Sequence, residues 1–345
     1  MPEQTCAVIL AGGEGKRMKS NHPKVLASVL FKPMLQWVMD AAEGAGVKEL
    51  CVVTGHKHEQ VEAYLQAAQK PGGANLHHVL QAEQRGTGHA VMMAEPFLRA
   101  HNGGNTLVLN GDAPFVSAEV LKTALAAHVG QGNAVTVISA ELDDPSGYGR
   151  IVRDPATGLV RAIVEQKDAD EATLAVREIN SGAYWFRTDD LLSILGCIRN
   201  DNAQGEYYLT DAVRLLIEQN KNAGAYIASD PAAVMGANDC VQLNSLNEIA
   251  RKRVLHAQML AGVEIPCTDG VLIGPDVTIG RSTRILPNTI LRGNTAVGAD
   301  CSIGPSVVLT DCTVGDGASL CFASCEHTNI SSSQAVAPFT VIGTP

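Results

Sequence analysis

Two patterns of hydrophobic and polar positions divide this chain. In the first pattern, short apolar runs alternate with stretches whose apolar residues have helical spacing. The clearest runs are residues 6–10, 51–54, 106–110 and 134–138, and we expect helices over residues 34–45 and 90–98. Runs that are apolar at most positions, without strict alternation, predict strands buried on both faces. Helical stretches between such strands predict right-handed connections in a mostly parallel sheet. We therefore expect an α/β domain with a Rossmann-like sheet over residues 1–243.

The second pattern has a period of six. Aliphatic residues recur at every sixth position, namely Ile273, Ile279, Ile285, Leu291, Val297, Ile303 and Leu309. A strict period of six is the mark of a hexapeptide β-helix, in which stacked coils bury the aliphatic row. We expect a helical linker over residues 244–262 and a short left-handed parallel β-helix over residues 263–345. Its later coils should be less regular, because Val314 breaks the step.

A glycine-rich turn follows the first predicted strand. It comprises Leu10, Ala11, Gly12 and Gly13, followed within reach by Arg17 and Lys24. Glycines let backbone N–H groups approach an anion, and two cations would complete a triphosphate site. The turn is not a Walker loop, which needs Gly-Lys-Ser/Thr, nor a dinucleotide fingerprint, because Met18 replaces the third small residue. The alternative interpretation is a plain tight turn.

A second glycine-containing turn precedes another apolar helix. Gln81 carries a planar amide, which suits the paired donor and acceptor groups of a base edge. Gly86 and Thr87 form the turn itself, where backbone amides would hold the same base. The alternative is an ordinary helix N-cap at Thr87.

Two oxygen-bearing side chains are candidates for a metal site. Asp112 directly follows the run at residues 106–110, and Asn238 follows a strand-like segment at residues 233–235. Mg²⁺ takes few protein carboxylates and leaves room for phosphate. Ligands of parallel sheets bind beyond the carboxyl ends of the strands, so we expect Gly12 and Asp112 to share one crevice. A turn aspartate is the alternative at Asp112.

Three polar positions lie between these segments. The backbone at Gly149, the Glu165 carboxylate and the Asn180 amide would suit the hydroxyls and the acetamido group of a sugar. Surface polar residues have the same appearance in a single sequence.

Composition excludes several classes of protein. The 345 residues suffice for two domains, and the net charge of −10 argues against a nucleic-acid-binding surface. We find neither an apolar stretch of membrane-spanning length nor a signal peptide. Nine scattered cysteines without a Cys-x-x-Cys pair indicate reduced thiols and a cytoplasmic location. Cys321, Cys325 and His327 could suggest a metal site, but small residues lining a coil interior are the simpler interpretation.

Taken in order, these segments resemble a known family, the bacterial N-acetylglucosamine-1-phosphate uridyltransferases. The resemblance covers nearly the whole chain and is carried by residues 10–26, 81–90, 147–151, 163–168, 200–211 and 236–243. The run at residues 203–211, Ala-Gln-Gly-Glu-Tyr-Tyr-Leu-Thr-Asp, is especially specific. The resemblance implies the nucleotide-diphospho-sugar transferase type of fold.

The resemblance also implies roles for individual residues. By this resemblance, the nucleotide is contacted by Leu10, Ala11, Gly12 and Gly13, its phosphates are bound by Arg17 and Lys24, and uracil is recognised by Gln81, Gly86 and Thr87. The resemblance likewise implies that Mg²⁺ is bound by Asp112 and Asn238, and that the sugar is held by Gly149, Glu165 and Asn180. Arg17, Lys24 and Asp112 would be the catalytic residues. The implied reaction joins UTP and N-acetylglucosamine 1-phosphate to give UDP-N-acetylglucosamine and pyrophosphate. The β-helix implies a homotrimer.

The chain departs from the family pattern at several positions. Gly12 and Lys16 resemble the wider sugar-nucleotide transferase superfamily, Asn110 replaces the usual residue before Gly-Asp, and Ser181 replaces a threonine. The sequence ends before the coils that carry acetyl transfer in full-length members, so we expect no acetyltransferase activity.

Three alternatives remain open at this point. A transferase for another sugar 1-phosphate, of the glucose, N-acetylgalactosamine or N-acetylmuramate type, would share the same motifs. A non-catalytic sensor of sugar nucleotides would have lost its metal ligands or phosphate cations, yet Arg17, Lys24, Asp112 and Asn238 are present. A hexapeptide acyltransferase would need a catalytic histidine in the coils, where His327 is the candidate.

Overall fold

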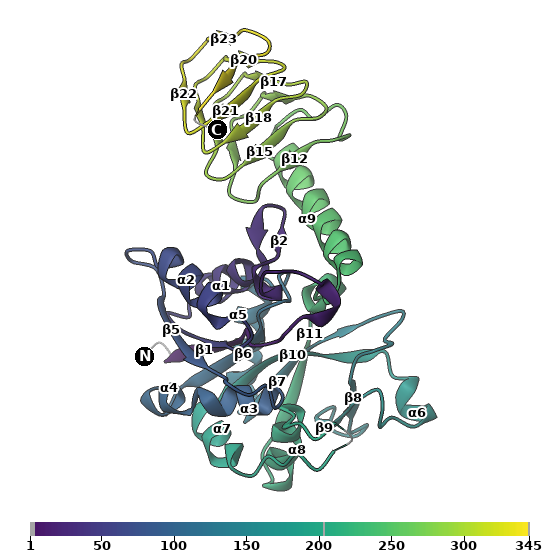
Figure 1. Ribbon diagram of the computed structural model, residues 1–345. Helices are drawn as coiled ribbons and strands as arrows, with labels where there is room; N and C mark the ends of the chain where they lie inside the picture. The colour runs from purple at the N-terminus through teal and green to yellow at the C-terminus, as the bar shows by residue number, and fades with distance from the viewer. Residues whose placement is uncertain (1–3, 203, 344–345) are drawn as a thin grey trace. The chain divides into compact units, whose positions relative to one another are not determined.

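The computed structural model describes residues 4–202 and 204–343, so Ala203 of the run at residues 203–211 lies outside the described part. The chain forms two compact units (Figure 1). The first unit comprises the chain up to Ala27 and Pro33–Cys240. The second comprises Ser28–Lys32 and the chain from Val241 onward.

A nine-stranded sheet organises the first unit. Its main order is β11 (Ala223–Ile227), β7 (Val135–Glu141), β10 (Glu178–Arg187), β6 (Asn105–Asn110), β1 (Thr5–Leu10), β4 (Glu49–Thr54) and β5 (Asn75–Leu80). All neighbours in this order are parallel except β10, which runs antiparallel to both β6 and β7. The remaining strands, β8 (Arg150–Arg153) and β9 (Val160–Val164), form a hairpin that joins β10. The expectation of a mostly parallel sheet is confirmed.

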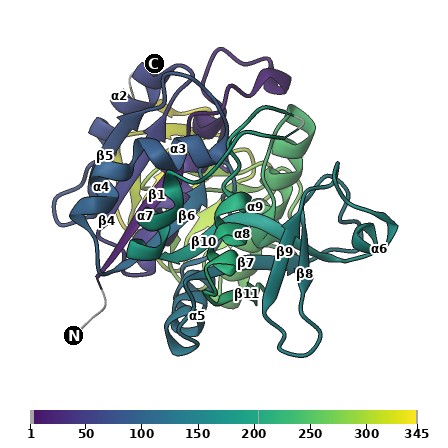
Figure 2. The same cartoon turned by 90° about the horizontal axis from the view of Figure 1, so that it is seen from below.

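Helices cover both faces of this sheet (Figures 1 and 2). Alternate residues of β1 enter different cores: Ala7 and Ile9 pack in one, Cys6 and Val8 in the other. The first core is covered by α1 (Met34–Gly44), α2 (His58–Ala68) and α5 (Ala118–Gly130). The second is covered by α3 (Thr87–Met93), α4 (Glu95–Ala100), α7 (Thr188–Leu195) and α8 (Thr210–Glu218). Burial on both faces explains why these strands are apolar at most positions.

Short elements complete the first unit. They are the 3-10 helices η1 (Lys16–Met18), η2 (Lys24–Leu26) and η3 (Pro231–Val234), and the helix α6 (Glu171–Leu174). The strand-like interpretation of residues 233–235 is therefore wrong. Pro231 fits the first turn of a helix, and the Asp230 carboxylate accepts a hydrogen bond from Ala232 N at 2.9 Å, which caps that turn. The helix expected over residues 90–98 is divided into α3 and α4 at Ala94.

The second unit contains a long helix and a parallel β-helix. The helix is α9 (Cys240–Leu260), whose first residue belongs to the first unit. Strands β2 (Ser28–Val29) and β3 (Lys32–Pro33) pair as a small hairpin. In the order in which they stack, the coil strands are β12 (Leu272–Ile273), β15 (Ile290–Arg292), β18 (Val308–Thr310), β21 (Ser324–Glu326) and β24 (Val341–Ile342); β13 (Thr278–Ile279), β16 (Ala296–Val297), β19 (Thr313–Val314) and β22 (Asn329–Ile330); and β14 (Arg284–Ile285), β17 (Ser302–Ile303), β20 (Ser319–Leu320) and β23 (Ala335–Val336).

The register of these strands confirms the expected change in coil length. Leu291 pairs with Leu309, 18 positions on, whereas Val297 pairs with Val314, which is 17 positions on. The aliphatic row is buried, as the period of six predicts. Cys325 lies in this core, whereas the His327 side chain is exposed beside Asp311 and Glu326. Cys325 and His327 therefore do not face the same space.

No helix in the described part of the chain has the length and apolar character needed to cross a membrane.

Candidate functional site

A cavity of about 610 Å³ opens beyond the carboxyl ends of β1, β5 and β6. We call it the first cavity. Most of the predicted site residues line it, namely Leu10, Gly12, Gly13, Lys24, Gln81, Gly86, Thr87, Asp112 and Glu165. The prediction that Gly12 and Asp112 share one crevice is therefore confirmed.

The other predicted residues lie around this cavity. Asn180 lines a second cavity of about 130 Å³, which shares Leu10, Thr87, Asn110, Glu165 and Tyr208 with the first. Ala11 and Gly149 are buried. Asn238 contacts Lys24. Arg17 is exposed on η1 and is not among the residues that line either cavity.

Close packing explains the first glycine of the turn after β1. A Cβ atom on Gly12 would lie 3.0 Å from Gln81 Oε1, and one on Gly55 would lie 2.6 Å from Gly12 O. The backbone of this turn therefore runs directly against the end of β4 and the Gln81 amide. This contact places the phosphate-binding candidate beside the base-binding candidate.

The turn at Gly86 is hydrogen-bonded to the loop before α8, which is distant in the sequence. Gly88 N donates to Tyr207 O at 2.7 Å, and Tyr207 N donates to Arg85 O at 2.8 Å. Leu209 N donates to the Thr87 hydroxyl oxygen at 3.1 Å. Thr87 is the first residue of α3, and its hydroxyl serves this loop, so the N-cap interpretation is wrong. The Gln81 amide, nearly fully buried, donates to Gly86 O at 3.1 Å.

We expect Gly86→Ala to damage this site. Gly86 has a φ of +104°, and its Cβ would lie 2.6 Å from Tyr207 O, so the substitution combines backbone strain with a collision. The free energy of unfolding should fall by about 1–3 kcal/mol, and the KM for the substrate that contacts this turn should rise. Urea unfolding and steady-state kinetics measure the two effects. Gly130→Ala, which meets no atom within 4 Å, is the matched control and should be nearly neutral.

A cation and two oxygen-bearing side chains meet at the wall of the first cavity. The Lys24 ammonium forms an ion pair with the Asp112 carboxylate and donates to Asn238 Oδ1 at 3.0 Å. The Lys24 and Asp112 side chains are mostly buried, with 14% and 21% of their surface exposed. Partial burial strengthens these charge interactions relative to those at an open surface. We call Lys24, Asp112 and Asn238 the cation cluster.

The donor set of the cation cluster fits a magnesium ion. The Asp112 carboxylate and the Asn238 amide oxygen both face one cation, the Lys24 ammonium, so their oxygens already converge on a single position. Mg²⁺ prefers such hard oxygen ligands and takes few of them from protein. Asp112 and Asn238 are thus the residues of this site that could hold the ion.

Polar groups suited to a sugar gather on the other side of the cavity. A Cβ atom on Gly149 would lie 3.3 Å from Glu165 Oε2, so the missing side chain lets the carboxylate approach the backbone. Asn180 N donates to Gly149 O at 2.8 Å, and the Tyr184 hydroxyl donates to Asn180 Oδ1 at 2.9 Å. Burial, and then the Asp168 carboxylate, raise the pKa of Glu165 above its ordinary value.

A β-bulge in β10 directly follows Asn180 and sets the position of its side chain. Asn180 pairs with Ser139 of β7, but the next pair joins Ala183 to Ile138, so the register shifts over Ser181 and Gly182. The Ser181 hydroxyl donates to Ile138 O at 2.5 Å and fixes the bulge. Bulges of this kind re-aim a side chain next to a functional site.

Several residues of the cavity wall received no role in the sequence analysis. Gln204, Glu206 and Tyr208 line the first cavity from the loop before α8, and Gln84, Lys167 and Asp168 line it from other loops. Gln204, Glu206 and Tyr208 belong to the highly specific run at residues 203–211, so the density of polar side chains around Gly205 was the signal that could have found them.

Two protein families match different parts of the chain. Residues 6–252 match the nucleotidyl transferase family, and residues 276–311 match six repeats of the bacterial transferase hexapeptide family. The bifunctional protein GlmU of Caldanaerobacter subterraneus subsp. tengcongensis is 43% identical over 340 residues, which cover 99% of this chain and 72% of that protein. The bifunctional protein GlmU of Brevibacillus brevis is 43% identical over 336 residues, covering 97% and 71%.

The fold has a solved counterpart. A UDP-glucose pyrophosphorylase complexed with UDP-glucose superposes with a TM-score of 0.60 at 19% identity, covering 72% of this chain and 99% of that one. This likeness shows a shared fold. The chain therefore belongs to the nucleotidyl transferase family, among the proteins named bifunctional protein GlmU, and is a sugar-1-phosphate nucleotidyltransferase.

Proposed function

We propose that the chain transfers a uridylyl group from UTP to N-acetylglucosamine 1-phosphate, forming UDP-N-acetylglucosamine and releasing pyrophosphate. The observation that carries this proposal is the cation cluster, which lies at the wall of a cavity between a glycine-rich turn and a group of sugar-type hydrogen-bonding residues. Such a cavity brings two anionic substrates together beside fixed positive charge.

The nucleotide would occupy the side of the cavity formed by the first turn. Leu10, Gly12 and Gly13 line that side, with Ala11 buried beneath. The Gln81 amide and the turn at Gly86 and Thr87 would contact the uracil ring. Lys24 would bind the phosphates, and Arg17, on the exposed turn after Gly15, is the second candidate for them.

Mg²⁺ would be held by Asp112 and Asn238. When bound there, the ion would supply positive charge that lowers the repulsion between the phosphates of the two substrates. The Lys24 ammonium, which contacts both of these residues, would be free to contact phosphate oxygens instead.

The chemistry needs no protein nucleophile. A sugar phosphate oxygen already carries negative charge and attacks the α-phosphorus of UTP, while pyrophosphate leaves from the opposite side. The protein would orient the reactants and neutralise the charge that gathers on the leaving pyrophosphate. Lys24 and Arg17 would stabilise that charge.

The sugar would occupy the side formed by Glu165, Gly149 and Asn180. The Glu165 carboxylate accepts hydrogen bonds from hydroxyl groups, and the Asn180 amide suits an acetamido group. The Tyr184 hydroxyl holds the Asn180 oxygen, which leaves the Asn180 NH₂ as the group available to a ligand.

The raised pKa of Glu165 predicts a pH dependence. Only the ionised carboxylate accepts hydrogen bonds through both oxygens, and protonation removes this ability as the pH falls through the raised pKa. The kcat/KM for the sugar 1-phosphate should therefore decline on acidification, beginning above the range of an ordinary glutamate.

Glu165→Gln is the matched control for this pH dependence. The phosphate of the sugar substrate titrates in the same way in assays of the variant and of the original protein, but the side chain at position 165 titrates only in the original protein. The ratio of the two kcat/KM values, original protein over variant, should fall toward acid pH. A ratio that stays constant from neutral to acid pH would remove Glu165 from sugar binding.

Pyrophosphate release tests the proposed function. The assay contains UTP and Mg²⁺ with N-acetylglucosamine 1-phosphate or with the glucose, N-acetylgalactosamine or N-acetylmuramate analogue. We expect release with N-acetylglucosamine 1-phosphate in clear preference to the others. Preference for another sugar would change the substrate but keep the reaction, whereas UTP binding without release from any sugar would indicate a sensor.

We also propose that the β-helix assembles the chain into a homotrimer. Parallel coils with a buried aliphatic row present flat outer faces that can pack against copies of themselves. Light scattering coupled to size exclusion should give three times the mass of the chain, and a monomer would exclude this assembly.

A further inference from the structure

The hairpin that carries part of the sugar side is weakly joined to the sheet. Strand β8 pairs with β10 at Arg150 and Ile179, and Asn180 N donates to Gly149 O nearby. In Figures 1 and 2, β8 and β9 lie together at the margin of the first unit. A two-stranded hairpin is marginally stable by itself, so additional contacts must hold it in place.

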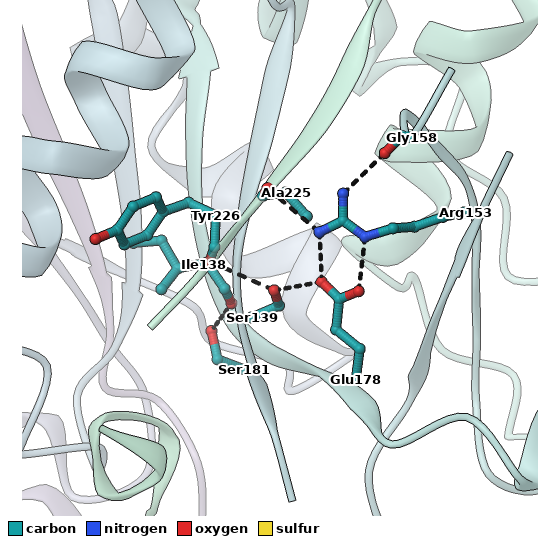
Figure 3. A network of polar contacts seen from close by, with 8 residues as sticks. All are labelled: Ile138, Ser139, Arg153, Gly158, Glu178, Ser181, Ala225 and Tyr226. Atoms are coloured by element: carbon teal, nitrogen blue, oxygen red, sulfur yellow. Dashed lines mark hydrogen bonds and ion pairs between the residues drawn. The ribbon is translucent and has the colours of Figure 1, made fainter. Parts of the chain in front are cut away.

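Ile151 and Val160 of the hairpin are buried in the second core, and an ion pair adds a directional polar contact (Figure 3). Arg153 Nε and Nη2 donate to Glu178 Oε2 and Oε1, both at 2.7 Å, so the pair is bidentate. The Ser139 hydroxyl donates to Glu178 Oε1 at 2.6 Å. The Glu178 side chain is 9% exposed and the Arg153 side chain 30%, and the charge-assisted hydrogen bonds of such a partly buried bidentate pair are directional and strong. We call Arg153, Glu178 and Ser139 the clamp.

The clamp reaches two further parts of the chain, the turn of the hairpin and β11. Arg153 Nη1 donates to Gly158 O, in the turn of the hairpin, at 2.8 Å. Arg153 Nη2 lies 3.4 Å from Ala225 O of β11, and the Ser139 hydroxyl lies 3.4 Å from Tyr226 O (Figure 3). One guanidinium group therefore joins the hairpin and its turn to β10 and β11.

The clamp links the two segments that carry the sugar side, the β8–β9 hairpin and β10. Gly149 and Glu165 flank the hairpin at its cavity end, beside the Arg150–Val164 pair. Asn180 lies two residues after Glu178 on β10 and pairs with Ser139. Glu178 and Ser139 thus flank Asn180, while Arg153 belongs to the hairpin. Separation of the ion pair would let Glu165 move relative to Asn180.

We propose that Arg153 and Glu178 are positioning residues that set the spacing between Glu165 and Asn180, and thereby the affinity for the sugar 1-phosphate. This inference rests on the proposed function for the identity of the substrate. The nucleotide side is formed by other segments, the turns after β1 and β5, so it should not depend on the clamp.

Substitution kinetics separate the two sides of the cavity. Glu178→Gln keeps the shape of the side chain but removes its charge, and Arg153→Lys keeps the charge but removes the bidentate geometry. Each should raise the KM for the sugar 1-phosphate by about 10- to 100-fold and leave the KM for UTP within about twofold. Asp143→Asn is the matched control, because it removes the exposed ion pair with Arg177, the neighbour of Glu178, and should change neither KM.

Hydrogen exchange tests whether the clamp holds the hairpin, independently of catalysis. Backbone amides of β8 and β9 should exchange faster in both clamp variants, while those of β1 and β6 stay unchanged. Equal rises in both KM values, or unchanged exchange in the hairpin, would overturn the proposal. An original protein that turns over no sugar 1-phosphate would instead contradict the proposed function, and the exchange result would still decide whether the clamp holds the hairpin.

Discussion

Asp112→Asn should lower kcat by about 10²- to 10³-fold while the protein remains folded. The asparagine has nearly the same shape, but it removes the negative charge that faces Lys24 and the strongest oxygen ligand of the cation cluster. Without it, the cluster would hold a divalent ion poorly, and the charge between the phosphates would be less well neutralised. Pyrophosphate release under saturating substrates measures kcat, and far-UV circular dichroism measures folding.

Asp276→Asn is the matched control for this substitution. Asp276 also accepts from a lysine, Lys32, at 2.7 Å, but in the second unit. Its loss should leave kcat within about twofold, because a partly exposed ion pair contributes little energy. Near-normal turnover of a folded Asp112→Asn protein would refute the assignment of the metal site to Asp112.

Lys24→Ala should produce two effects of opposite sign. Turnover should fall by about 10²- to 10³-fold, because a cation that stabilises the leaving pyrophosphate is lost. The free protein should at the same time bind Mn²⁺, a substitute for Mg²⁺, more tightly, because the Lys24 ammonium no longer occupies the position between Asp112 and Asn238. Steady-state kinetics measure the first effect, and titration followed by electron paramagnetic resonance measures the second.

Lys32→Ala serves as the control, since Lys32 also pairs with an aspartate but lies in the second unit. It should change neither turnover nor metal affinity. Unchanged Mn²⁺ affinity in Lys24→Ala would show that the ammonium and the metal do not compete for the same oxygens, and that outcome would contradict the proposed metal site between Asp112 and Asn238.

Much of the fold could be predicted because burial leaves a local trace in the sequence. The strands at residues 6–10 and 106–110 are apolar at most positions because they are covered on both faces. The coil shortening at Val314 is likewise visible as a break in the period. Strand β10 was not predicted, since its Asn180–Ser181–Gly182 bulge interrupts the apolar pattern. Its antiparallel direction depends on the path of the whole chain and has no local signal.

The site, like the fold, has features that could be predicted from the sequence and features that could not. The glycine-rich turn and Asp112 could be placed in one crevice, because both follow strands that end at the same edge of the sheet. The contact between Lys24 and Asn238 joins residues 214 positions apart, and the bond from Leu209 to Thr87 joins residues 122 apart. Such pairings depend on the folded geometry and have no periodic signal. The roles of the individual site residues therefore remain predictions.

The stereochemical course at the α-phosphorus tests the central claim most directly, namely that the sugar phosphate attacks UTP in line within the first cavity. A single diastereomer of UTP with sulfur on the α-phosphorus is turned over with N-acetylglucosamine 1-phosphate, and the configuration of the product is determined. A single displacement predicts inversion. Retention would require a nucleotidyl group bound covalently to the protein, and it would contradict a mechanism in which Lys24, Asp112 and their neighbours only orient and neutralise the reactants.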